Sequence, residues 1–144
     1  MPKTVTSAAT LPASPRTLYR MFLSSKEHGA ACGADARIAP RVGGTFSIFG
    51  GSLSGRTLLL KPGRMIVQAW RSTSFRPGDE DSVLVLTFSG DAKRGKISLV
   101  HVNVPDHDAQ GVKSGWQDFY WKPWSAYLAR PARAGKRKGG RKRR

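Results

Sequence analysis

The chain begins with a short extended segment and then changes to helical periodicity. Val5–Ala9 can form an opening strand. Ser14–Pro15 is typical of an N-cap followed by the first helical position, and the apolar residues of Leu18–Phe22 recur at i, i+3 and i+4. Ser24–Glu27 matches a capping box, and Gly33 is typical of a helix end. We therefore expect two short helices, packed end to end, after the first strand.

Between residues 37 and 104 the pattern becomes that of an antiparallel meander. Short clusters of Gly, Pro and Asp separate segments that are rich in β-forming residues. The predicted strands are Thr45–Phe49, Ser54–Leu60, Met65–Ser72, Ser82–Phe88 and Lys96–Val104. Two-residue alternation places one set of side chains on a common face: Phe46, Ile48, Leu84, Leu86, Phe88, Ile97, Leu99 and His101. An apolar face of this kind must be covered by another element.

The covering element is predicted to be a last helix, Val112–Leu128. Its aromatic residues recur at spacings of four, four and three: Trp116, Tyr120, Trp124 and Tyr127. Pro123 removes a backbone donor inside this stretch, so we expect a bend there rather than an end, because the stripe continues on both sides. Helices on one face of an antiparallel sheet indicate an α+β fold.

Positive charge is concentrated at the C-terminus. The 144 residues include 25 Lys and Arg against 9 Asp and Glu, a net charge of +16, and nine of the last fifteen residues are basic. We expect a folded domain over residues 1–129 and a disordered basic tail over residues 130–144. Such a tail binds nucleic-acid phosphates weakly and without sequence preference. Its polyanion-binding candidates are Arg137, Lys138, Arg141, Lys142, Arg143 and Arg144.

Cysteine and histidine are too scarce for several classes of site. Cys32 is the single cysteine and there are three histidines, which excludes an intramolecular disulfide and a structural zinc site made from Cys and His. The chain has no apolar signal segment and no run of eighteen apolar residues. We expect a cytoplasmic protein that does not insert into a membrane, with no metal and no cofactor.

The side chains that can carry chemistry each have a structural interpretation. His28 and Cys32 lie four residues apart and can share a helix face, but a small thiol among alanines is more typical of packing. Asp106–Asp108 offers metal ligands, yet it stands where a turn or an N-cap is expected. Asp79–Asp81 is typical of a solvated hairpin tip. With no convincing cluster of titratable groups, the sequence favours a non-enzymatic protein and no catalytic residue.

An ordered set of short segments resembles a known family. The segments are Val42–Ser47, Gly55, Pro62–Ile66, Trp70–Arg71, Ser82, His101–Pro105, Gly115–Trp116, Pro123 and Tyr127–Leu128. Together they resemble the activator of Hsp-90 ATPase homologue-like family, within the START-like (SRPBCC) superfamily of helix-grip domains. The resemblance covers about Val5 to Leu128. It implies a curved antiparallel sheet of about seven strands wrapped around a long C-terminal helix, with a cavity between them.

The resemblance also implies two alternative functions. In related domains the cavity receives lipids or hydrophobic small molecules, whereas the eukaryotic namesake binds a chaperone and raises its ATPase activity. We expect the first function, with chaperone contact as the alternative and nucleic-acid association through the tail as a third. His101 shares a face with the cavity, where it either orients a ligand or is satisfied by a neighbouring hydroxyl. The ligand-cavity candidates are Phe46, Ile48, Trp70, Leu84, Leu86, Phe88, Leu99, His101, Trp116, Tyr120 and Trp124.

Overall fold

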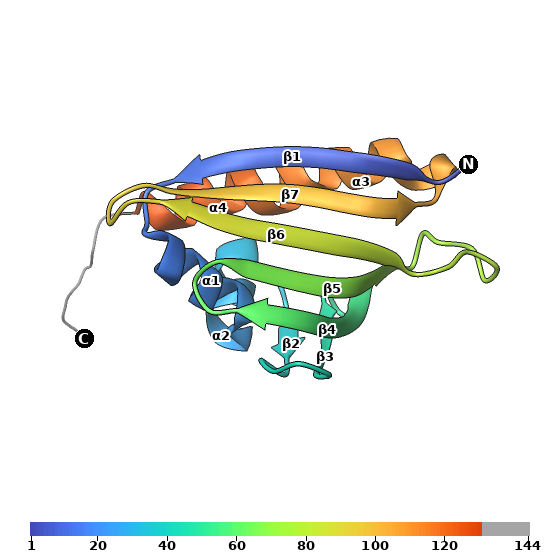
Figure 1. The fold of residues 1–144 in the computed structure, drawn as a ribbon, viewed down its shortest axis with the longest axis horizontal. Coiled ribbons are helices and arrows are strands. Elements are labelled where there is room, and N and C mark those ends of the chain that lie inside the picture. Colours follow the sequence, from blue (N-terminus) through green and yellow to red (C-terminus); the bar gives the residue numbers. More distant parts are fainter. Residues whose placement is uncertain (131–144) are drawn as a thin grey trace.

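One antiparallel sheet of seven strands forms the front layer of the molecule, and the helices lie behind it (Figure 1). The computed structural model describes residues 1–130. The strands are β1 (Lys3–Leu11), β2 (Ala36–Ile38), β3 (Thr45–Ile48), β4 (Leu53–Lys61), β5 (Met65–Ser72), β6 (Ser82–Gly90) and β7 (Gly95–Val104). Their order across the sheet is β1-β7-β6-β5-β4-β3-β2, so β1 and β2 are the two edges. The predicted α+β helix-grip fold is confirmed.

Two short helices connect the edge strands β1 and β2. They are α1 (Pro15–Leu23) and α2 (Ser25–Cys32). Ser24 ends the first and begins the second, and its Oγ accepts a hydrogen bond from the Glu27 amide at 3.1 Å. Gly33 then takes the left-handed conformation at φ 69°, which a residue without Cβ adopts at little cost. Both expected helices are confirmed, with the predicted start of each and the predicted end of the second at Gly33.

The C-terminal helix is a composite of several helical types. It comprises the 3₁₀ turn η1 (Asp106–Asp108), α3 (Ala109–Gly115), the π-helical segment η2 (Trp116–Trp121) and α4 (Lys122–Leu128). As expected, the helix continues through Pro123. Proline donates no hydrogen bond and its ring crowds the carbonyl four residues earlier. The helix widens immediately before it, since the Lys122 amide bonds to the Gln117 carbonyl five residues back.

The π-helical segment changes which aromatic residues reach the core. Of the predicted stripe, Trp116, Tyr120 and Trp124 are buried, whereas Tyr127 is only partly buried. Trp121 is buried as well, because the wider turn brings residues five apart onto the same side. Its ring stacks on that of Trp116, with centroids 5.8 Å apart and planes 28° apart. A regular 3.6-residue period could not place both rings there.

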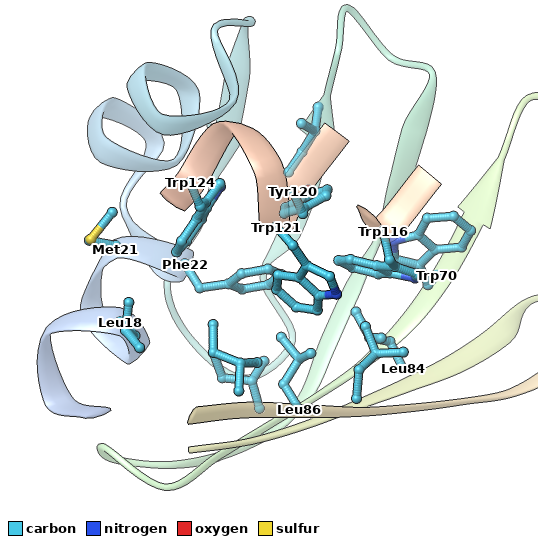
Figure 2. Close-up of a cluster of buried hydrophobic side chains, with 14 of the residues drawn as sticks. Leu18, Met21, Phe22, Trp70, Leu84, Leu86, Trp116, Tyr120, Trp121 and Trp124 are labelled. Carbon is cyan, nitrogen blue, oxygen red and sulfur yellow. The ribbon is translucent and has the colours of Figure 1, made fainter. Parts of the chain in front are cut away.

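The core lies between this helix, α1 and the sheet. Figure 2 shows the aromatic rings of the C-terminal helix between the side chains of α1 and the leucines of β6. Leu84 and Leu86 of β6 are fully buried, as are Leu18 and Trp124. Large aromatics therefore supply much of the contact between the helix and the concave face of the sheet.

Strand β2 is the element that the residue pattern missed. It has only three residues, Ala36–Ile38, which is too short for its alternation to stand out, and it pairs only with β3. The basic tail expected from residue 130 onward lies outside the described residues, apart from Arg130 itself. Within residues 1–130, no helix is both long enough and apolar enough to span a membrane.

Candidate functional site

A groove of about 490 Å³ opens between the C-terminal helix and the ends of β4 and β5. Its walls come from the β3–β4 turn, the end of β5 with the segment that follows it, and one face of the helix. The lining residues are Phe49, Ser52, Leu53, Trp70, Ser72, Thr73, Ser74, Asp108, Gly111, Val112, Gly115, Trp116, Phe119 and Tyr120. Most of this surface is aromatic or aliphatic, and serine and threonine hydroxyls and one carboxylate contribute polar groups.

Phe49 and Phe119 are in contact with each other in the lining of the groove. Phe49 has a φ of 56°, which is uncommon for a residue with a side chain, and it precedes two glycines with positive φ. This turn directs its ring toward the helix, 5.8 Å from the centroid of Phe119 in an edge-to-face contact. Phe119 remains 59% exposed, so much of its ring is free to meet a bound molecule.

Asp108 gives the groove a polar end. The helix residues Gly111 and Gly115 leave space beside it on the groove side. Among the described residues, the Asp108 carboxylate forms no ion pair and no side-chain hydrogen bond. Partial burial is the main cause that raises its pKa above the ordinary aspartate value. Asp108 therefore occupies the expected N-cap position of α3, but its side chain accepts no hydrogen bond from the helix amides.

A chain of buried hydrogen bonds links Trp116 and Trp70, two residues that line the groove, through His101 and Ser82. Trp116 Nε1 donates to His101 Nδ1 at 3.2 Å, which requires the histidine proton to be on Nε2. That nitrogen then donates to Ser82 Oγ at 2.8 Å, and the serine hydroxyl donates to the Trp70 carbonyl at 2.7 Å. Burial lowers the pKa of His101 to about 3. His101 is thus a neutral residue with both ring nitrogens satisfied by neighbours.

His28 of α2 links the same helical segment, η2, to the end of α1, and it is the opposite tautomer. Its Nδ1 donates to the Phe22 carbonyl at 2.8 Å, so its Nε2 accepts from the Tyr120 hydroxyl at 2.8 Å. Burial lowers the pKa of His28 to about 4 despite the backbone hydrogen bond. Sequence spacing gave no sign of this contact, because its partners are 6 and 92 residues away.

Cys32 is a packing residue rather than a nucleophile activated by His28. Its half-buried Sγ accepts a hydrogen bond from Trp124 Nε1 at 3.2 Å. Burial raises the pKa of the thiol to about 11, against the opposing effect of that hydrogen bond. His28 has both ring nitrogens engaged elsewhere, so the two side chains do not form a thiol–imidazole pair.

The acidic Asp79–Asp81 segment is held in place rather than simply solvated. Asp79 Oδ2 accepts from His107 Nε2 at 2.9 Å and from the Arg76 amide at 2.7 Å, which keeps the Asp79 pKa below its usual value. Arg71 donates to the carbonyls of Asp79 and Arg76, at 2.7 Å each. The loop after β5 is thereby fastened to the start of the C-terminal helix.

The structure divides the predicted ligand-cavity residues into two groups. Trp70, Trp116 and Tyr120 line the groove. The others are buried in the core and do not line it: Phe46, Ile48, Leu84, Leu86, Phe88, Leu99, His101 and Trp124. Sequence reasoning missed Phe119, which lies off the aromatic stripe, and Asp108, which was assigned to a cap. An exposed aromatic residue beside a buried stripe was the available signal for Phe119.

Comparison with known proteins places this architecture in a family. The chain is 32% identical over 105 residues to "Activator of 90 kDa heat shock protein ATPase homolog" of Dictyostelium discoideum, covering 72% of the chain and 27% of that protein. It is 28% identical over 118 residues to "Activator of 90 kDa heat shock protein ATPase homolog 1" of Homo sapiens, covering 82% of the chain and 35% of the human protein. The chain thus spans about a third or less of these relatives' length.

Solved structures share the fold. An HSP90 activator from Plasmodium falciparum superposes with a TM-score of 0.79 at 23% identity, covering 89% of this chain and 97% of the other. The Aha1 dimer from Colwellia psychrerythraea gives a TM-score of 0.71 at 15% identity, covering 88% and 97%. Residues 12–129 match the family described as Activator of Hsp90 ATPase homolog 1-like protein. The chain belongs to that family, as its short sequence segments indicated.

Proposed function

We propose that this protein is a non-enzymatic binding module that holds a hydrophobic small molecule in the groove beside its C-terminal helix. The observation that carries the proposal is the open groove of about 490 Å³, whose lining is mostly aromatic or aliphatic with a few polar groups. Pockets for small molecules are concave, mostly apolar and of roughly 300 to 1,000 Å³. The groove fits that description in size and in chemistry.

The groove favours a flat ligand with a polar end. Phe49 and Phe119 form an edge-to-face pair in the lining of the groove, and an aromatic ligand gains from contact with such rings. Asp108 and the serines at the end of β5 provide hydrogen-bond acceptors and donors in the lining. A hydroxyl or amine on the ligand would satisfy the unpaired carboxylate, whereas a ligand carboxylate would be repelled by it.

The buried histidines support binding rather than catalysis. His28 and His101 are neutral, with pKa values lowered to about 4 and about 3, and all four ring nitrogens are already hydrogen-bonded. A general base must reach the proton that it removes, and neither imidazole has a free nitrogen to do so. Both residues hold the helix in place.

Binding of N-phenyl-1-naphthylamine, a neutral fluorescent aromatic amine, tests the proposal. Gly115→Leu places a side chain into the groove from the helix, where a Cβ meets only the Phe119 ring, at 3.6 Å. We expect this variant to lose about tenfold or more in probe affinity, as for the loss of a well-packed apolar contact. Gly78→Leu is the matched control, since a Cβ there has nothing within 4 Å. Equal binding by all three proteins would refute the groove as the site.

A chaperone co-factor is the second candidate, and the named relatives favour it. The curated relatives at 28% and 32% identity carry the name of activators of the 90 kDa heat shock protein ATPase. The test is the ATPase rate of that purified chaperone with increasing amounts of this protein. A saturable rise supports this function, and an unchanged rate at saturating concentration excludes it. Gly115→Leu separates the two candidates, because contact with a chaperone does not require an open groove.

A further inference from the structure

Six exposed basic side chains gather at the end of the molecule opposite the groove. They come from the start of α1, the β4–β5 turn and the β6–β7 turn with the strand that follows it: Arg16, Lys61, Arg64, Lys93, Arg94 and Lys96. We call this set the basic end. In Figure 1 both turns and the start of α1 lie on the left, whereas the loop between β5 and β6 lies on the right.

Close backbone packing fixes the three segments relative to one another. A Cβ on Gly63 of the β4–β5 turn would lie 4.0 Å from the Cα of Arg16. A Cβ on Gly95, after the β6–β7 turn, would lie within 3.1 Å of the backbone of Pro15. The cations are therefore presented on adjacent turns of a rigid scaffold.

The positive charge of the basic end is uncompensated within the described residues. Over residues 1–130, none of its six side chains forms an ion pair or a side-chain hydrogen bond. The one carboxylate among them, Asp91, accepts hydrogen bonds from the amides of Lys93 and Arg94 at 2.9 Å each. That acid shapes the turn and leaves both side-chain cations free.

Several acidic residues lie at the other end, in the loop after β5 and at the start of the C-terminal helix, and three of them are paired. Asp79 accepts from His107 at 2.9 Å, Asp81 pairs with Arg71 at 3.2 Å, and Asp106 pairs with Lys3 at 3.7 Å. The charge of the folded body is thus asymmetric along the sheet. A surface of one sign attracts a partner of the opposite sign and orients it before contact.

We propose that the basic end is a binding surface for the phosphate backbone of duplex nucleic acid. Arginine and lysine on several turns can contact successive phosphates, and the affinity comes from counterion release. The proposal is independent of the groove.

The chemistry of the turns favours nucleic acid over an anionic membrane. A peripheral membrane surface combines basic residues with large apolar side chains that insert between lipids. The exposed turns Lys61–Arg64 and Asp91–Arg94 contain no such side chain. Half of the six cations are arginines, whose guanidinium groups bind phosphate oxygens in a bidentate manner.

Binding of the full chain to a fluorescent 20-base-pair DNA duplex tests the proposal. One variant removes three charges from the basic end, Arg64→Gln, Lys93→Gln and Arg94→Gln. Its matched control removes three exposed charges elsewhere, Arg41→Gln, Arg56→Gln and Lys113→Gln. We expect the first to bind about tenfold more weakly at 50 mM salt and its log–log salt slope to be less negative by roughly 0.9 per lost phosphate contact. The control should stay within about twofold of the unmodified chain, and two unrelated duplexes should bind alike.

Two results would overturn the proposal. Equal weakening of the two triple variants would mean that net charge alone, rather than the basic end, determines binding. The second measurement is binding of the same variants to vesicles of phosphatidylserine and phosphatidylcholine. A larger effect of the basic-end variant on vesicle binding than on DNA binding would assign the surface to lipid headgroups instead. Thermal unfolding of both variants confirms that they are folded.

Discussion

Trp116 Nε1 donates a hydrogen bond to His101 Nδ1 across 3.2 Å, joining the C-terminal helix to β7 inside an aromatic core. Both side chains are almost fully buried. The contact fixes the histidine as the Nε2–H tautomer, and this in turn fixes the direction of the hydrogen bond to Ser82. One aromatic residue on the helix thereby sets the orientation of a polar chain within the sheet.

Replacement of this histidine should destabilise the fold. His101→Leu leaves the Trp116 indole N–H buried without an acceptor, and an unsatisfied buried donor costs about 1 to 3 kcal/mol. We expect the midpoint of urea unfolding to fall accordingly. His101→Gln, whose amide can both accept and donate, should recover part of the loss. A leucine variant as stable as the unmodified protein would show that the hydrogen bond contributes little.

Stability should decrease as the solution becomes acidic. The pKa values of His28 and His101 in the folded state, about 4 and about 3, lie below the ordinary value of 6.5. The unfolded chain therefore binds more protons below neutrality, so the stability present above pH 6.5 is lost as the pH falls toward 4 and 3. For His28 the difference corresponds to roughly 3 kcal/mol.

Urea unfolding at several pH values between 7.5 and 4 measures this loss directly. The imidazole proton resonances of the folded protein provide the site-specific check. We expect those of His28 and His101 to keep the chemical shifts of neutral rings down to about pH 5. Titration of either buried ring near pH 6.5 would contradict its assigned hydrogen bonds.

Cys32 should react slowly with thiol reagents in the folded protein. Burial raises its pKa to about 11, so at pH 8 the reactive thiolate is scarce. We expect iodoacetamide labelling to be on the order of 100-fold slower in buffer than in urea. Cys32→Ser keeps an acceptor for Trp124 and should lower stability slightly while leaving probe binding in the groove unchanged. Fast labelling of the native protein would indicate a reactive thiol.

Gly55 should tolerate no side chain. A Cβ at this position in β4 would overlap the Ala69 carbonyl oxygen of β5 and lie 2.8 Å from the ring of Phe46. Gly55→Ala therefore forces the strands apart or moves a buried ring, and overpacking of this kind costs about 1 to 3 kcal/mol or more. Gly78→Ala, which meets nothing within 4 Å, is the matched control. Equal melting temperatures for the two variants would refute the close approach.

Local patterns in the sequence determined most of the fold. The capping residues before each short helix, the alternation in five strands and the aromatic stripe on the last helix each depend on neighbours within a few residues. The segment Met65–Ser72 was predicted with the bounds that β5 has. Such features can be recognised from short segments of the chain, because propensity, capping and periodicity act locally.

The groove depended on tertiary structure. Phe119 was not predicted to line it, because the π-helical segment changes the period of the helix and residues distant in sequence decide which faces are covered. Phe49 contacts Phe119 only because its turn takes a positive φ. The neutral states of His28 and His101 likewise result from burial, and their tautomers from hydrogen bonds to residues that spacing alone does not bring near. By itself the sequence determined which side chains are apolar and which elements form, whereas packing decided which of them meet, because burial and long-range contacts exist only after the sheet and the helix come together.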